Sequence, residues 1–187
     1  MDGIQQAINN LNTISGTAVP VATAQAVNRV AVRAIGRSVK RVSGETQLQQ
    51  KLIRQRVRLR RASSKQSVPR ARLLVNRGNL PAIALGTAKV QLSRKRRDKH
   101  GRGSVLKIGR FKFEDAFIQQ LANGRWHVMQ RTSNSRYPID VVKIPLVTPL
   151  TQAFTDETES LLKSDMPKEL GQALKNQLRL YIKARLP

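Results

Sequence analysis

Positive charge is concentrated in the first two-thirds of this chain, and this asymmetry constrains the fold more than any other feature of the sequence. Between residues 29 and 112 there are 25 basic residues and two acidic ones, Glu45 and Asp98. From Thr151 onward, six basic and five acidic residues nearly cancel. The formal net charge is +24, and repulsion at that density opposes compaction unless counterions or an anionic partner screen it. The basic part therefore predicts an anionic partner, and the C-terminal part is expected to have a different role.

The composition is otherwise that of a globular protein. The chain has 187 residues, of which 40% are hydrophobic and 25% charged, so it is long enough for one domain with a hydrophobic core. Aromatic residues make up only 4%, so the core must be built from Val, Ile, Leu and Ala. Cysteine is absent, which excludes disulfides and Cys-ligated metals.

The first 60 residues have a helical period. Ile4, Ile8 and Leu11 have helical spacing, and Gly16 and Pro20 are expected to interrupt the pattern. A second helix is expected over residues 21–42 and a third from residue 45 to about 59. The second has an apolar stripe of mostly small residues that would allow a neighbouring element to approach closely: Ala24, Val27, Ala31, Ala34 and Val42.

From residue 71 the period changes to that of strands. Short apolar runs are expected to be strands at 71–75, 80–85, 88–92, 104–108 and 110–113. The strongest hairpin signal joins 117–121 to 125–129 through Asn123-Gly124, because Asn-Gly readily adopts the positive φ values of such turns. Residues after 149 form an amphipathic helical region broken at Pro167.

The sequence predicts an α+β fold with N-terminal helices, a small central antiparallel β-sheet with hairpins, and C-terminal helices. Its regions are 1–61 (basic, helical), 62–70 (linker), 71–148 (β, with a basic loop at 94–103) and 149–187 (helical).

The basic loop at 94–103 has two interpretations: it contacts phosphates, or it is a solvated hairpin tip. Because the preceding segments are also basic, we predict anion contact, with the steep salt dependence that clustered cations give. Nothing in the sequence indicates recognition of bases. The predicted nucleic-acid or anion contacts are Arg94, Lys95, Arg96, Arg97, Lys99, Arg102, Arg54, Arg56, Arg58, Arg60 and Arg61.

Motifs for catalysis or cofactor binding are lacking. Gly101-Arg102-Gly103 does not have the glycine spacing or the Gly-Lys-Ser/Thr ending of a phosphate loop. The two histidines, His100 and His127, have no further ligands at zinc spacing, and no carboxylate pair suits general acid–base chemistry. We predict a non-enzymatic protein without metal or cofactor. The single tryptophan, Trp126, is expected to anchor the core, with an interface role as the alternative.

A membrane surface is the competing anionic partner. No apolar run approaches the roughly 20 residues of a spanning helix, and the N-terminus lacks the features of a signal peptide. The sequence therefore favours nucleic acid as the anionic partner and predicts no contact with a membrane.

Several segments of the chain carry a resemblance to a known family. Residues 116–121, 123–131 and 136–145 resemble the signature of the minor tail protein Z family of lambda-like bacteriophages, and residues 76–81, 92–97 and 166–171 resemble its middle and end. The helical N-terminus, residues 11–34, is similar as well. The motif residues that carry the resemblance are Phe117, Asn123, Gly124, Trp126, Arg131, Arg136, Pro138 and Ile139.

This resemblance implies a structural tail-completion or neck protein at the head-proximal end of a long-tailed phage tail. It would be assembled in the host bacterial cytoplasm and needed for head–tail joining and for positioning the DNA end. The implied partners are the tail terminator and tube proteins, the head-side connector and the DNA end, held by backbone charge. A homo-oligomeric ring, with a hexamer favoured, is also implied. The alternative, from charge alone, is a sequence-independent nucleic-acid-binding accessory protein.

Overall fold

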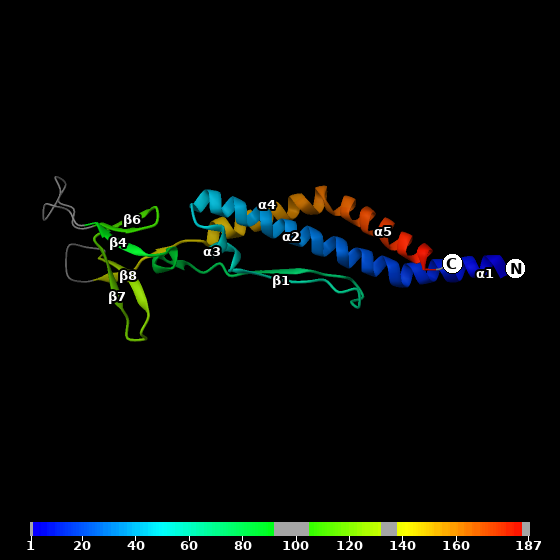
Figure 1. The fold of residues 1–187 in the computed structure, drawn as a ribbon, viewed down its shortest axis with the longest axis horizontal. Helices are drawn as coiled ribbons and strands as arrows, with labels where there is room; N and C mark the ends of the chain where they lie inside the picture. The colour runs from blue at the N-terminus through cyan, green and yellow to red at the C-terminus, as the bar shows by residue number, and fades with distance from the viewer. Residues whose placement is uncertain (1, 92–104, 132–137, 185–187) are drawn as a thin grey trace. The chain divides into compact units, whose positions relative to one another are not determined.

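The computed structural model describes residues 2–91, 105–131 and 138–184. Contacts group the chain into two compact units, Met1–Asn76 with Pro149–Pro187, and Arg77–Thr148. The helices are α1 (Asp2–Thr13), α2 (Val19–Thr46), α3 (Gln50–Arg54), α4 (Val147–Ser164) and α5 (Met166–Lys183), with a π-helical turn η1 (Ile14–Ala18) and a 3-10 turn η2 (Ala82–Leu85). The strands are β1 (Val57–Arg60), β2 (Arg72–Val75), β3 (Leu80–Pro81), β4 (Ala88–Gln91), β5 (Val105–Ile108), β6 (Phe111–Glu114), β7 (Ala116–Gln120), β8 (Trp126–Arg131), β9 (Ile139–Val141) and β10 (Lys143–Ile144). The predicted α+β class is confirmed (Figure 1).

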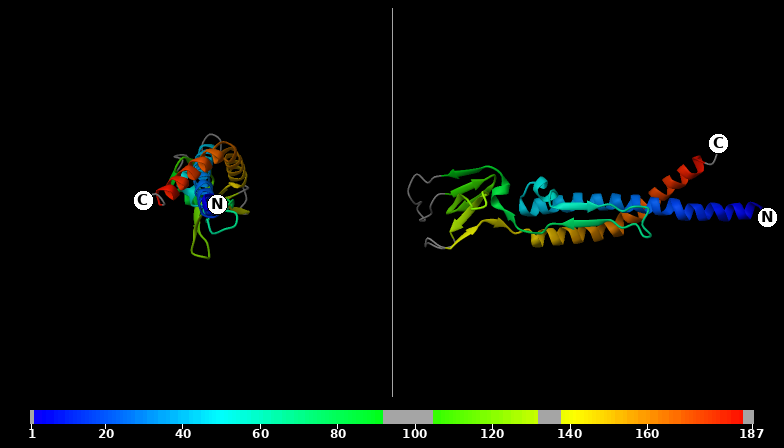
Figure 2. Two further views of the ribbon diagram at one scale, coloured as in Figure 1. Left: turned by 90° about the vertical axis from the view of Figure 1, so that its right-hand side faces the viewer. Right: turned by 90° about the horizontal axis from the view of Figure 1, so that it is seen from below.

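The first unit is organised around α2, with α4 and α5 packed along it (Figure 1, Figure 2). Its alanines make this contact close: Ala22 and Ala26 of α2 meet Ala173 of α5, and all three are fully buried. Further along α2, Val30 and Ala34 pack on Leu161 of α4. Of the stripe expected from the sequence, Ala34 makes such a contact, whereas Ala22 and Ala26, which meet α5, were not part of it.

The expected break at Gly16 and Pro20 does not occur. The helix continues from α1 through the π-helical turn η1 into α2, and Pro20 occupies one of the first two positions of α2. Proline lacks an N–H and clashes with the carbonyl one turn before it, and a widened turn before the proline accommodates both effects.

The third predicted helix is wrong in its second half. Glu45 and Thr46 are the end of α2, only Gln50–Arg54 of the remainder is helical, and Val57–Arg60 is the strand β1, paired antiparallel with β2. Val57 and Leu59 alternate with arginines, which is the period of a strand with one buried face. The predicted linker, residues 62–70, lies in the hairpin loop 61–71 that joins β1 to β2.

The second unit holds small antiparallel sheets in the described residues: β10–β3, β4–β5–β6 and β7–β8–β9. Leu106, Ile108 and Val128 are essentially fully buried in it. The predicted Asn-Gly hairpin is confirmed, with Gly124 at φ 74° between β7 and β8. The strand expected over 80–85 is mostly wrong, because Ala82–Leu85 forms a 3-10 turn after a two-residue strand.

Candidate nucleic-acid interface

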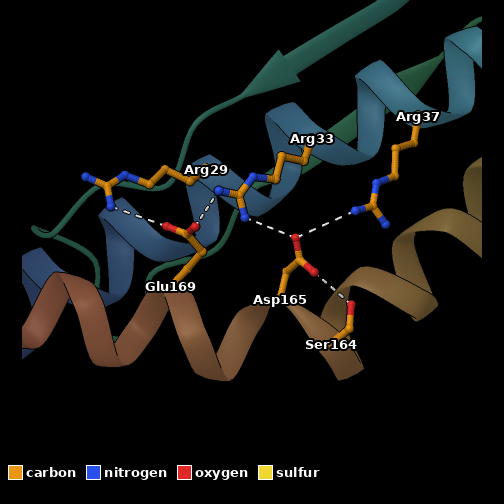
Figure 3. Close-up of polar contacts among 6 residues, drawn as sticks. All are labelled: Arg29, Arg33, Arg37, Ser164, Asp165 and Glu169. Atoms are coloured by element: carbon orange, nitrogen blue, oxygen red, sulfur yellow. Dashed lines mark hydrogen bonds and ion pairs between the residues drawn. The ribbon is translucent and has the colours of Figure 1, made fainter.

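The cations of the first unit fall into two groups with different surroundings. One group is a row of arginines on α2, namely Arg29, Arg33, Arg37 and Arg41, which we call the arginine row. Successive members are four residues apart, so they lie on one face of the helix. That face is turned toward acidic side chains of α4, of α5 and of the residue between these helices, the last two of which Figure 3 draws.

Figure 3 shows how the arginine row is neutralised at the junction of α4 and α5. Arg33 donates from Nη1 to Asp165 Oδ2 at 3.0 Å, and its Nη2 pairs with Glu169. Arg29 Nη1 lies 3.3 Å from Glu169 Oε2, and Arg37 Nη2 lies 4.0 Å from Asp165 Oδ2. Two carboxylates therefore bridge three arginines.

The last member of the row is paired separately. Arg41 donates from Nε to Glu45 and from Nη1 to Asp156, both at 2.9 Å. Glu45 is on the same helix, four residues further on, whereas Asp156 belongs to α4. The row thus ties α2 to both C-terminal helices.

These contacts change proton affinities in the direction expected of ion pairs. Hydrogen bonds, first to Glu169 and then to Asp165, raise the pKa of Arg33, and those to Glu45 and Asp156 raise the pKa of Arg41. Hydrogen bonds from Ser164 and from Arg33 lower the pKa of Asp165 below its ordinary value. The charged forms are favoured on both sides, so the row is satisfied within the chain. We call this set of ion pairs between the arginine row and the carboxylates of the C-terminal region the clamp. It was not predicted from the sequence, although the four-residue spacing of the arginines and the acidic residues of the C-terminal region indicated it.

The second group lies on the β1–β2 hairpin. The alternation of β1 turns Val57 and Leu59 inward and leaves Arg58 and Arg60 exposed. On β2, Arg72 is exposed directly opposite Arg60, and Arg58 faces Leu74. Like charges directly opposite each other in a sheet are unfavourable, so this arrangement is one that an anion would relieve.

The loop of the hairpin adds to this charge. Arg61 and Arg70, at its two ends, join Arg60 and Arg72 around a hollow of about 520 Å³. Gln66, Ser67 and Val68 complete the wall. We call Arg60, Arg61, Arg70 and Arg72 the hairpin cluster. Within the described part of the chain, none of the four makes an ion pair with a carboxylate.

The predicted contact residues are therefore distributed unevenly. Arg58, Arg60 and Arg61 lie together on the hairpin, and Arg54 is exposed in the last turn of α3. Arg56 is different: its Nη1 donates to the carbonyl of Asn76 at 3.2 Å, and burial lowers its pKa. Sequence reasoning missed Arg70 and Arg72, which only the strand pairing brings to Arg60 and Arg61.

The predicted contacts in the basic loop, Arg94 to Arg102, lie outside the described residues, as does Arg136 of the family motif. The other motif residues build the sheet around β8. The guanidinium of Arg131 lies 5.6 Å from the centre of the Phe117 ring, and Asn123 Oδ1 accepts a hydrogen bond from the backbone N–H of Arg125. Pro138 and Ile139 lead into β9.

Trp126 is not a core anchor. Its side chain is 56% exposed at the start of β8, so the expectation of a buried tryptophan is wrong. Position 126 falls at the turn end of the hairpin, opposite Gln120, whereas the buried position of the same strand face is Val128.

Residues 2–91, 105–131 and 138–184 contain no group of three or more His, Cys, Asp or Glu side chains that could hold a metal ion. His127 is half-buried on β8, and its Nδ1 has no hydrogen-bond partner among these residues. Of the helices that the structure describes, none combines the length and apolarity needed to cross a membrane.

The clamped helices, small sheets and arginine hairpin define a class: a basic α+β protein with an exposed cluster of arginines that the described carboxylates do not neutralise. Comparison with known proteins makes the class specific. The chain belongs to the family Prophage minor tail protein Z (GPZ), which it matches over residues 1–184, and the resemblance noted in the sequence is confirmed.

Two curated relatives match nearly the whole chain. The tail completion protein of Escherichia phage N15 is 62% identical over 182 residues, covering 97% of this chain and 98% of the relative. Tail completion protein Z of Escherichia phage lambda is 53% identical over 189 residues, covering 97% of each chain. No solved structure matches.

Proposed function

We propose that this chain is a structural tail-completion protein at the head-proximal end of a long phage tail, where it is needed for head–tail joining and for positioning the DNA end. The observation that carries the proposal is family membership along almost the entire chain, together with relatives that are named tail completion proteins. The role is structural and non-catalytic. Its site of action is the virion, after assembly in the host bacterial cytoplasm.

The charge distribution gives this role a physical basis. A duplex end is recognised without reading its sequence when cations meet backbone phosphates. The arginine row is neutralised by the chain's own carboxylates, whereas the exposed hairpin arginines have no such partner in the described residues. We assign the hairpin to the DNA end, and we propose Arg94 to Arg102 as further contacts with it.

The proposed partners follow from the same position. They are the tail terminator and tube proteins, the head-side connector, and further copies of this chain in a closed ring, with six copies favoured. Ring closure repeats one surface around the axis, so each hairpin would be presented to the centre or to the rim in the same way. Native mass spectrometry of the purified chain, alone and with tail terminator, tests the ring.

The proposal is tested by removing the gene from its phage and supplying it in trans. Without the protein, tails and filled heads are expected to accumulate separately, and complementation restores infectious particles that contain the protein by mass spectrometry. Particles that join and infect normally without the protein would refute the proposal.

A free, sequence-independent nucleic-acid-binding accessory protein is the second candidate, favoured by the net charge of +24 alone. It predicts tight binding to random duplex but no protein in purified virions. Quantifying the chain in virions therefore separates the two candidates.

A further inference from the structure

We infer that the hairpin cluster, Arg60, Arg61, Arg70 and Arg72, is a phosphate-binding site for the backbone of duplex nucleic acid. The inference rests on the proposed function and deepens it by assigning the contact to one hairpin. It also adds Arg70 and Arg72, which the sequence alone did not single out.

The geometry of the hairpin gathers the charge. Arg60 and Arg72 are direct cross-strand partners at the end of the ladder, Arg61 follows Arg60 immediately, and Arg70 lies two residues before Arg72. Side chains that are direct cross-strand neighbours have Cβ atoms about 4.5–5.5 Å apart. Four guanidinium groups are thereby tethered within a short length of ribbon.

The hairpin is held by packing on its other face. Leu73 packs against the buried group formed by Val30, Ala34 and Leu161, and Leu59 points inward from β1. The side chain of Asn28 on α2 donates to the carbonyl of Ala62 at 3.0 Å and accepts from its N–H at 2.8 Å. The cluster is therefore fixed to α2 where the loop begins, and it is presented on a supported strand.

The chemistry of the hollow suits phosphate oxygens. Guanidinium groups donate in pairs to phosphate, and the lining adds the Ser67 hydroxyl and the Gln66 amide. The Gln66 Oε1 accepts from the backbone N–H of Arg70 at 3.2 Å, which is a local contact within the second half of the loop. No acidic residue occurs in the sequence from residue 46 to residue 97, so no carboxylate of this segment competes with an incoming anion.

Duplex nucleic acid fits this surface better than an acidic protein does. Protein interfaces place apolar and aromatic side chains at their centre, whereas nucleic-acid interfaces are more polar and far more positive. Val68 is the apolar residue of the hollow, which arginines and polar side chains otherwise line. Arg58 continues the row of exposed cations along β1, as a regularly charged polyanion requires.

The test measures binding of the full-length chain to a random fluorescent duplex at several salt concentrations. The variant carries R60Q, R61Q, R70Q and R72Q, and the matched control K107Q, K112Q, R125Q and K143Q removes the same charge from exposed positions elsewhere. The slope of log affinity against log salt is negative. If all four arginines contact phosphates, its magnitude decreases by about 3 to 4 in the variant and by less than about 1 in the control. Equal slopes for the native chain and the variant, or an equal loss in the control, would overturn the site.

Two further arms keep the result interpretable. The double variant R61Q/R70Q lies outside the strands, so it leaves the ladder intact and is expected to lower the slope by about 2, with an unchanged circular dichroism spectrum. Polyglutamate of matched charge is expected to displace the duplex less well than unlabelled duplex does, and equal displacement would overturn the assignment in favour of an acidic protein.

The outcomes also separate this site from the proposed function. If the chain completes tails while the hairpin variant binds duplex with native salt dependence, the site is wrong and the function stands. If the hairpin variant loses duplex binding but the chain is absent from virions, the site stands and the function is wrong.

Discussion

At the scale of single residues, burial separates structural side chains from those available for contact. Leu161 and Leu162 are neighbours on α4 with the same chemistry, yet Leu161 is fully buried and Leu162 is 47% exposed. Trp126 and Val128 make a similar pair on β8. The exposed member of each pair is accessible to other molecules, and the buried member contributes to the stability of the fold.

Leu161→Ala is expected to lower the free energy of unfolding by about 2–5 kcal/mol, because it removes a fully buried side chain that packs on Val30 and Ala34. The matched control Leu162→Ala is expected to change it by no more than about 0.5 kcal/mol. Urea unfolding followed by circular dichroism measures both. Equal losses would contradict the packing described here.

Trp126→Ala is expected to leave the free energy of unfolding within about 1 kcal/mol of the native value, because the side chain is mostly exposed. If its exposed ring serves an interface, the same substitution lowers tail completion in the complementation assay. Val128→Ala, at the buried position of the strand face, should instead destabilise the fold. A large loss of stability on replacing Trp126 would show that the ring is part of a core.

At the scale of elements, the clamp between α2 and the C-terminal helices is electrostatic on one side and tightly packed on the other. Asp165 and Glu169 bridge the arginine row, and Ala173 meets Ala22 and Ala26. The stability that the ion pairs contribute depends on pH, whereas the stability that the packed alanines contribute depends on side-chain volume. Each is therefore tested by a different substitution.

The pKa of Asp165 is lowered in the fold, so its charged form stabilises the folded state. That stabilisation is fully present above the ordinary aspartate pKa of 3.8 and is lost as pH falls through the lower, folded value. Asp165→Asn is therefore expected to melt at a lower temperature than the native chain at pH 6, with the difference shrinking below pH 3.8. Glu159→Gln is the control, since Glu159 pairs with no arginine of the row. A difference for Asp165→Asn that is constant with pH would contradict the clamp.

Ala173→Leu is expected to cost about 1–3 kcal/mol, because the added carbons have no room between α5 and α2. Amide hydrogen exchange should rise in α5 before it rises in α2. Gln172→Leu adds a side chain of similar size at an exposed neighbouring position and is the control. Native exchange in α5 of the Ala173 variant would refute the close contact.

Elements with local signals were predictable, and those set by distant contacts were not. The Asn123-Gly124 hairpin and the break of the C-terminal helical region near Pro167 followed from turn and helix chemistry. Val57–Arg60 was assigned to a helix because its arginines continued a basic helical pattern, although its alternation is that of a strand. Pro20 was expected to end a helix, and only the π-helical turn before it explains why it does not.

In the candidate site, too, residues with a local signal were predicted and residues brought together by distant contacts were not. Arg58, Arg60 and Arg61 were predicted from local charge, but Arg70 and Arg72 depend on the register of β1 with β2. The pairing of Arg33 with Asp165 spans 132 residues, so no local pattern reveals it.

At the scale of the whole molecule, the net charge of +24 remains after the clamp is counted, because the four arginines of the row are matched by four carboxylates. Repulsion among the rest opposes the folded state. Added salt or polyanion is therefore expected to raise the melting temperature, and a short duplex should do so at far lower concentration than monovalent salt. A melting temperature that falls steadily with duplex would contradict this balance of charges.

The most direct test of the central claim, that the unpaired arginine hairpin meets the DNA end in the tail, is photo-crosslinking inside the assembled virion. A photoreactive amino acid at Val68, in the hollow of the hairpin cluster, is compared with one at Val32, exposed on α2. Position 68 is expected to crosslink to phage DNA, and position 32 to protein alone. Crosslinks from position 68 to tail or head proteins without DNA would contradict the claim.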